Sequence, residues 1–198
     1  MNLPNKLTIS RLIMAPLFFT VFFLPEWFGP SLQTVSVVLM LLLYVLTELS
    51  DLLDGIIARK HDLVTDLGKV MDPFADTLSR LTYFVCFIGV QIMPVWAFVI
   101  IMWREFSIVF LRMLMMGTGK AVAANIWGKS KAVMYAVSGL AGIAYVSALR
   151  LSEQVDWILW AEPILLVVFG LAAVASLASF VTYIASMIRE KSLSHLSR

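Results

Sequence analysis

The chain has 198 residues, of which 61% are hydrophobic and 14% are charged, and its mean hydropathy is +0.91. Soluble domains carry about 25% charged residues, so this composition excludes a soluble globular domain and predicts an all-α integral membrane protein. The formal net charge of +2 gives no indication of a nucleic-acid partner, and we expect none.

Hydropathy predicts six transmembrane helices, each long enough to cross about 30 Å of hydrocarbon. They belong to a single domain that spans residues 1–198, because the chain has no room for a separate soluble domain. Proline and glycine residues separate several of the helices. In chain order, the predicted helices cover residues 7–24, 33–60, 67–89, 94–117, 130–150 and 156–188.

The distribution of lysine and arginine predicts which side of the membrane each helix end faces. The links near 25–32 and 90–94 contain neither residue, whereas both termini and the links near 59–69 and 112–131 contain several. Because basic residues remain on the cytoplasmic side, both termini are expected in the cytoplasm, in a multi-pass protein of the cell (inner) membrane. Arg150 is the exception, since it follows the fifth predicted helix on the opposite side.

Four aspartates flank the predicted turn between the second and third helices. The spacing within each pair is three or four residues, which places both carboxylates of a helix on one face. The two pairs are nearly equally distant from the turn, so an antiparallel hairpin brings them to matching depths near the cytoplasmic surface. The pairs are Asp51 with Asp54 and Asp72 with Asp76.

Carboxylates gathered in this way repel one another unless cations lie between them. Oxygen ligands without cysteine or histidine favour Mg²⁺, Mn²⁺ or Ca²⁺, and two ions about 4 Å apart suit four shared carboxylates. The alternative is that each aspartate caps a helix or pairs with a neighbouring basic residue. Small residues on the same helix faces favour a ligand site instead, and they are Gly55, Ala58 and Gly68.

The spacing of these residues resembles the signature of the CDP-alcohol phosphotransferase family, and all eight fixed positions match. Three further segments, 3–11, 103–106 and 128–131, are similar to those of bacterial phosphatidylglycerophosphate synthases, which belong to that family. In this chain the signature reads Asp51-x2-Asp54-Gly55-x2-Ala58-Arg59-x8-Gly68-x3-Asp72-x3-Asp76.

The resemblance implies a membrane enzyme of six transmembrane helices that forms a homodimer, with its active site open to the cytoplasm and the inner leaflet. It implies transfer of a phosphatidyl group from CDP-diacylglycerol to the hydroxyl of a small alcohol, with release of CMP. Two Mg²⁺ or Mn²⁺ ions are expected on the four aspartates, Asp51, Asp54, Asp72 and Asp76, and Asp76 matches the general base.

The resemblance also implies a set of residues that hold the CDP moiety and its diphosphate. Some lie on the segment of the first helix that closes over the nucleotide, and the others lie around the aspartates. A glycine beside the aspartates lets the nucleotide approach the backbone. The expected set is Asn5, Thr8, Arg11, Gly55, Ala58, Arg59, Thr65 and Gly68.

The favoured acceptor is glycerol 3-phosphate, whose phosphate requires fixed cations. Arg104 and Arg112 are eight residues apart, about two helical turns, and so lie on roughly one face. The alternative for Arg104 is a salt bridge with Glu105 or another acid, and lysines at cytoplasmic helix ends are expected from topology alone. The candidate acceptor-binding residues are Arg104, Arg112, Lys129 and Lys131.

One position departs from the pattern of the phosphatidylglycerophosphate synthases. Thr77 follows Asp76, where many of these enzymes have lysine, and Arg80 could supply the missing charge or pair with Asp76. Choline, serine, inositol phosphate and a lipid alcohol therefore remain alternative acceptors.

Two other classes of function fit the sequence less well. A divalent-cation transporter needs polar groups across the bilayer or at its midplane, but residues 35–46 and 81–90 contain almost none. A scaffold with a structural metal site would not require Gly55 and Gly68 beside the acids. The sequence therefore favours a CDP-diacylglycerol-dependent phosphatidyltransferase.

Overall fold

The computed structural model describes residues 2–60, 65–116, 126–152 and 158–189, and these residues contain helices but no strand. Six helices of 20 to 32 residues account for most of them. A short α2 (Leu24–Phe28) and a 3₁₀ turn η1 (Pro30–Leu32) link the first two long helices. The long helices are α1 (Leu3–Phe22), α3 (Gln33–Lys60), α4 (Asp66–Gly89), α5 (Val95–Met116), α6 (Ile126–Leu151) and α7 (Ile158–Arg189).

The long helices coincide with the six predicted hydrophobic segments, with shifts of a few residues at their ends. The largest shifts are at the starts of α1 and α6. Helix α1 begins at Leu3 because the side chain of Asn2 accepts a hydrogen bond from the amide of Asn5, 3.2 Å away. Such a cap satisfies one of the free amides of the first turn, and Pro4 in that turn has no amide to satisfy.

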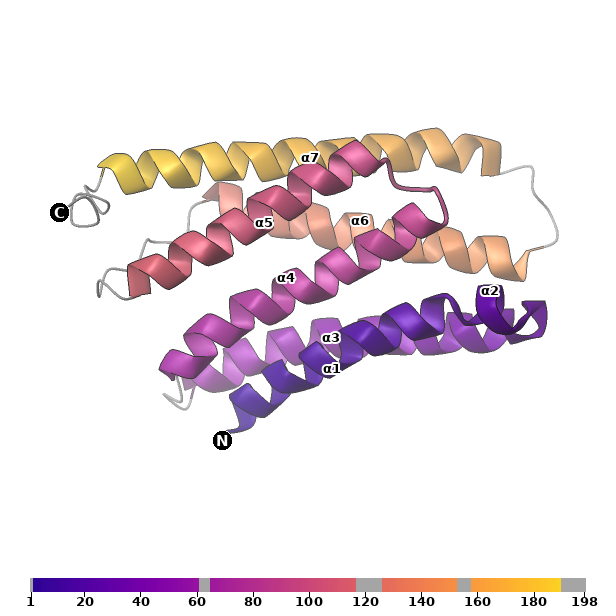
Figure 1. The fold of residues 1–198 in the computed structure, drawn as a ribbon, viewed down its shortest axis with the longest axis horizontal. Coiled ribbons are helices and arrows are strands. Elements are labelled where there is room, and N and C mark those ends of the chain that lie inside the picture. Colours follow the sequence, from indigo (N-terminus) through magenta and orange to yellow (C-terminus); the bar gives the residue numbers. More distant parts are fainter. Residues whose placement is uncertain (1, 61–64, 117–125, 153–157, 190–198) are drawn as a thin grey trace.

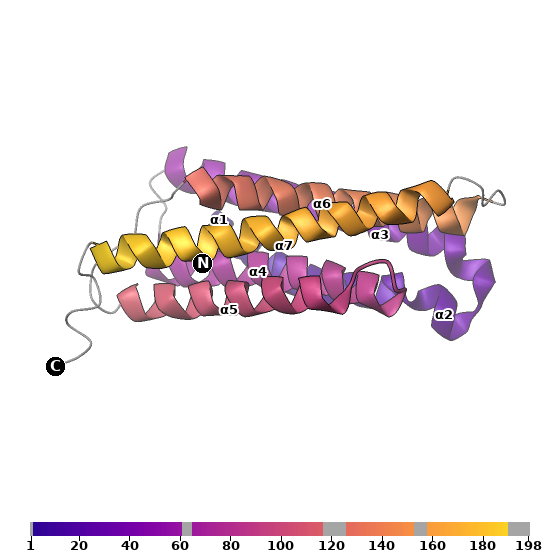
Figure 2. The ribbon, with the colours of Figure 1, turned by 90° about the horizontal axis from the view of Figure 1, so that it is seen from above.

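The helices run side by side along the long axis of the molecule (Figures 1 and 2). The first residues of α1, α4 and α6 and the last residues of α3, α5 and α7 lie at one end, on the left in Figure 1. Helix α1 packs along both α3 and α4, whereas α7 packs against α5 and α6. In the described part of the chain, α3 and α4, which carry the aspartates, pack far more extensively against α1 than against each other. Helix α1 therefore lies between them, in place of the direct antiparallel pairing that the sequence predicted.

Aromatic side chains dominate the centre of the bundle. The rings of Phe84 and Phe169 pack edge to face, with centroids 6.2 Å apart, and both are buried. Gly142 lets α6 approach α4 closely at a second aromatic ring, because a Cβ at Gly142 would lie 2.5 Å from the ring of Phe87. Close van der Waals packing of this kind is the main force between helices in lipid.

Among the residues that the structure describes, three helices are long and apolar enough to cross a membrane by length and composition, namely Pro30–Ile57, Ser130–Leu151 and Trp160–Arg189. Large apolar side chains on these helices are exposed on the surface of the bundle, among them Leu42, Val137, Leu140, Val167 and Val174. In water such a surface would be unfavourable, so its extent favours contact with lipid.

Arg150, the exception in the charge distribution, joins three elements at the end of the bundle where α2 lies. Its guanidinium donates to the carbonyl of Phe22 at 2.7 Å, to Glu26 at 2.8 Å and to the hydroxyl of Ser36 at 2.9 Å. It also lies over the ring of Phe22, 4.8 Å from the centroid. The basic residue on this side is therefore used to fix the end of α1 to α3 and α6.

Candidate functional site

All four aspartates of the signature contact one guanidinium, that of Arg11 in α1. One nitrogen of Arg11 lies 2.5 Å from Asp51 and also contacts Asp76, and the other contacts Asp54 and lies 3.7 Å from Asp72. The side chain of Arg11 is only 1% exposed. The structure thus brings the four predicted carboxylates together around a cation supplied by another helix.

The geometry of three helices produces this convergence. Asp51 and Asp54 face α1 from α3, Asp72 and Asp76 face it from α4, and α1 packs against both helices. Asp54 is buried at 5% exposure, whereas the side chains of Asp51 and Asp72 are 39% and 46% exposed. One side of the cluster is therefore open to small solutes.

A polar stripe on α1 continues from Arg11 toward the start of the helix. Thr8, one turn before Arg11, donates its hydroxyl to Asp72 at 2.5 Å. Asn5, a further turn away, accepts a hydrogen bond from the hydroxyl of Thr65 at 3.2 Å. Residues three apart lie on one helix face, so this face of α1 is joined to α4 by polar contacts.

Gly68 makes the contact between α1 and α4 possible. A Cβ at this position would lie 3.1 Å from the side-chain oxygen of Asn5 and 3.1 Å from that of Thr65. Thr65 in turn caps α4 by accepting from the amide of Gly68 at 3.0 Å. Five of the expected CDP-binding residues, Asn5, Thr8, Arg11, Thr65 and Gly68, therefore lie together.

The remaining three expected CDP-binding residues lie in the last turns of α3. Gly55 follows Asp54 directly and is half-buried. Ala58 and Arg59 belong to the helix, but their side chains lie outside the described part of the structure. All three precede the connection at the end of the bundle where α1 begins (Figure 1).

The carboxylate cluster fits divalent ions by its chemistry. In the described part of the chain, no three histidine, cysteine, aspartate or glutamate side chains are arranged to hold one ion. The guanidinium of Arg11 occupies the space between the four aspartates. Because it stands where a cation is needed, and because carboxylates are the ligands that Mg²⁺ and Mn²⁺ prefer, the donor set suits such ions.

A second charged cluster is built around Glu105 in α5. Its carboxylate accepts from Arg104 at 2.8 Å and from Lys131 in α6 at 2.6 Å. Arg104 also donates to the hydroxyl of Ser179 in α7 at 2.8 Å. All four residues are buried, so the cluster joins three helices inside the bundle.

Two of the four candidate acceptor-binding residues, Arg104 and Lys131, thus lie together on Glu105. Arg112 is exposed near the end of α5, so Arg104 and Arg112 occupy different environments despite their spacing of two turns. The side chain of Lys129 lies outside the described part of the structure. The salt bridge between Arg104 and Glu105, the alternative that the sequence offers for Arg104, is present.

Thr77 and Arg80 connect the two clusters. The hydroxyl of Thr77, the residue that follows Asp76, lies 3.4 Å from Glu105 and is buried. Arg80, one turn beyond Asp76, interacts electrostatically with both Asp76 and Glu105. The sequence indicated Glu105 only as a partner for Arg104, since its contacts with Thr77 and Lys131 depend on how α4, α5 and α6 pack.

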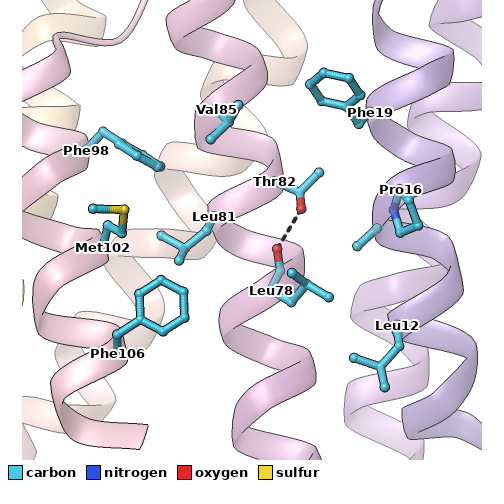
Figure 3. A pocket seen from close by; sticks show the side chains of 11 residues that line it. Leu12, Pro16, Phe19, Leu78, Leu81, Thr82, Val85, Phe98, Met102 and Phe106 are labelled. Carbon is cyan, nitrogen blue, oxygen red and sulfur yellow. Dashed lines mark hydrogen bonds between the residues drawn. The ribbon is translucent and has the colours of Figure 1, made fainter. Parts of the chain in front are cut away.

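An apolar groove of about 520 Å³ is lined by α1, α4 and α5. Figure 3 shows α4 in the middle of the groove, with α1 and α5 on either side. Leu12 follows Arg11 in the chain, and Leu78 is two residues beyond Asp76. The other lining residues are Ala15, Pro16, Phe19, Leu81, Thr82, Val85, Phe98, Met102 and Phe106.

Comparison with known proteins places these features in a family context. The sequence profile of the family described as CDP-alcohol phosphatidyltransferase matches residues 1–169. A Treponema pallidum protein named CDP-diacylglycerol–glycerol-3-phosphate 3-phosphatidyltransferase is 34% identical over 93% of this chain and 88% of its own length. A Bacillus subtilis protein of the same name is 36% identical over 70% of this chain and 76% of its own length.

A third relative has a different name. The cardiolipin synthase (CMP-forming) of Streptomyces coelicolor is 34% identical over 53% of this chain and 47% of its own length. The chain is therefore similar to two proteins named as glycerol-3-phosphate 3-phosphatidyltransferases and, over about half its length, to one named as a CMP-forming cardiolipin synthase.

Proposed function

Because the chain belongs to the CDP-alcohol phosphatidyltransferase family, we propose that it transfers a phosphatidyl group from CDP-diacylglycerol to glycerol 3-phosphate and releases CMP. The names of the Treponema and Bacillus relatives support this acceptor. The observation that carries the proposal is the convergence of four carboxylates from α3 and α4 on one cation.

We propose that all six long helices cross the membrane as one domain and that both termini lie in the cytoplasm. The arrangement in Figure 1 supports this, because the helix ends that carry Lys6, Lys60 and Arg112 lie at the same end of the bundle. The aspartates lie toward that end too. The site would then face the cytoplasm at the inner leaflet of the cell membrane, where lipid phosphates lie.

We propose two Mg²⁺ or Mn²⁺ ions as cofactors, held by Asp51, Asp54, Asp72 and Asp76. When bound, such ions neutralise the donor's diphosphate and the charge of the departing CMP. Asp76 accepts the proton of the attacking acceptor hydroxyl as the new phosphorus–oxygen bond forms. The exposed edge of the cluster, at Asp51 and Asp72, supports access by the substrates.

The donor is proposed to lie across the aspartates and the apolar groove. Asn5, Thr8, Arg11, Thr65 and Gly68 surround the polar end of this path, and Gly55, Ala58 and Arg59 complete the expected set at the end of α3. The groove in Figure 3 supports placement of the acyl chains, because it is apolar and is lined by α1 and α4, the helices that carry Arg11 and Asp76.

The acceptor's phosphate is proposed to bind near the Glu105 cluster. Arg104 and Lys131 supply two positive charges for the single carboxylate of Glu105, while Arg80 is shared between Glu105 and Asp76. A phosphate would balance the excess on Arg104 and Lys131. Arg112 and Lys129 remain candidates at the rim of this region. Family membership also supports a homodimer, which we propose for the assembled enzyme.

A lipid alcohol is the second candidate acceptor. Two observations favour keeping it: Thr77 stands where lysine is usual in the phosphatidylglycerophosphate synthases, and the Streptomyces relative is named as a cardiolipin synthase. A lipid acceptor would enter from the bilayer and not from the cytoplasm.

An acceptor panel tests the proposal. The purified chain in lipid nanodiscs is supplied with CDP-diacylglycerol, MgCl₂ or MnCl₂, and one acceptor at a time, and the product lipids are identified by mass. We expect phosphatidylglycerophosphate and CMP with glycerol 3-phosphate, and neither product after treatment with EDTA. If a product formed only with phosphatidylglycerol, this lipid alcohol would replace glycerol 3-phosphate as the proposed acceptor. If no acceptor led to CMP release, the proposed function would be refuted.

A further inference from the structure

The cation at the centre of the four aspartates belongs to the protein itself. Arg11 reaches them from α1, and its partners are 40 to 65 residues away in the sequence. Its guanidinium is almost fully buried. Although Thr8 and Asn5 also tie α1 to α4, only Arg11, among these three residues, carries a charge into the cluster.

The charges in this arrangement do not balance locally. Within the described residues, Arg11 is the cation in ion-pair contact with the carboxylates of Asp51, Asp54, Asp72 and Asp76. Arg80 adds a second positive charge that interacts electrostatically with Asp76 and Asp51, so two described cations face four carboxylates. The Nε of Arg11 is buried and has no hydrogen-bond partner. Like charges held this close are unfavourable, and the cluster therefore retains a strong attraction for further cations.

We infer that Arg11 and divalent ions compete for the four aspartates, so that metal binding displaces the guanidinium from the cluster. The nitrogens of Arg11 are within hydrogen-bond reach of three carboxylates and fill the position that ions bridging them would need. This inference rests on the proposed function for the identity of the metal site. It adds that Arg11 sets the metal affinity and orders the carboxylates before the metal arrives.

Displacement also gives Arg11 a second partner. A guanidinium released from the carboxylates can bind a diphosphate in bidentate fashion, and the donor supplies one. Metal binding would then make Arg11 available to the nucleotide. Under thermodynamic linkage the two ligands favour each other's binding, so the donor binds more tightly to the metal-loaded protein and the metal ions bind more tightly to the donor complex.

Binding of Mn²⁺ alone, measured by electron paramagnetic resonance of the free ion, tests the competition without any turnover. If Arg11 leaves the aspartates free for only about one tenth of the time, they bind Mn²⁺ about tenfold more weakly than they would without Arg11. We therefore expect Arg11→Met to tighten Mn²⁺ binding by about tenfold or more. Lys6→Met is the matched control, because Lys6 is exposed on the same helix and its loss changes the net charge equally. The control should shift the affinity by less than about twofold.

A second measurement uses the unaltered protein, in case Arg11→Met does not fold. Phenylglyoxal modifies accessible arginines, and peptide mass mapping shows which ones react. We expect Arg11 to be protected without metal and to become reactive when Mn²⁺ is added. Arg112, which is exposed, should react equally in both conditions and serves as the internal standard.

The results separate the inference from the proposed function. Equal or weaker Mn²⁺ binding by Arg11→Met, or continued protection of Arg11 in metal-loaded protein, would overturn the competition even if CMP release persisted. Failure of the unaltered protein both to bind Mn²⁺ and to release CMP would instead refute the proposed function. Tighter binding by Arg11→Met together with metal-dependent reactivity of Arg11 would support the competition.

Discussion

The ammonium of Lys131 in α6 lies 2.6 Å from the carboxylate of Glu105 in α5, and both side chains are buried. The same carboxylate also holds Arg104, which reaches Ser179 in α7. Glu105 is thus the shared partner of two cations that we place near the acceptor.

Replacement of Glu105 by glutamine should destabilise the bundle. Arg104 and Lys131 would keep their charges and lose their shared counter-ion, and breaking a buried ion pair in this way costs about 3 kcal/mol. Thermal unfolding in detergent measures the effect. Glu26→Gln is the matched control, because Glu26 pairs with Arg150 but is 41% exposed, and its loss should cost under about 1 kcal/mol. Similar losses in both variants would contradict the role given to Glu105.

The variant Asp76→Asn tests the proposed general base. We expect the rate of CMP release to fall by about 10²–10⁴-fold, because the amide cannot accept the acceptor's proton. The measurement is CMP release at saturating glycerol 3-phosphate, with the unfolding temperature as a check on the fold. Normal turnover in a folded Asp76→Asn protein would remove Asp76 from the reaction.

Substitution of Gly68 by alanine should separate α1 from the aspartates. The added Cβ would press on the side chains of Asn5 and Thr65, and a small misplacement of Thr8 and Arg11 should lower kcat/KM by about tenfold or more. Gly170→Ala is the control, because the nearest atom to its Cβ, in Trp96, would be 3.8 Å away. If Gly68→Ala and Gly170→Ala retain the same activity, the close approach at Gly68 is not needed for catalysis.

Arg150→Met should weaken the opposite end of the bundle without a direct effect on the site. The variant loses the bonds to Phe22, Glu26 and Ser36, which we expect to lower the free energy of unfolding by about 2 kcal/mol. Arg112→Met, at an exposed position, should unfold at nearly the unaltered temperature. The prediction fails if Arg150→Met is as stable as Arg112→Met.

The sequence by itself determined the elements of this protein and the matching depths of its aspartates. Long apolar runs predicted the six long helices to within a few residues at most ends, because hydropathy is a property of neighbouring residues. Helical periodicity predicted that the two aspartates of each helix share one face and lie close to the link between α3 and α4, because the spacing of residues along the chain encodes that periodicity. These aspartates are Asp51, Asp54, Asp72 and Asp76. The match to the family signature depended on the same spacing and was confirmed by the family comparison.

Only the tertiary structure decided what stands among the aspartates and what holds the acceptor-side cations. Arg11 reaches Asp76 across 65 residues, and Glu105 reaches Lys131 across 26. Neither contact follows from a local pattern, because each depends on which faces α1, α5 and α6 turn toward their neighbours. Those faces are chosen by side-chain packing throughout the bundle, including the close approach of α6 to Phe87 that Gly142 permits.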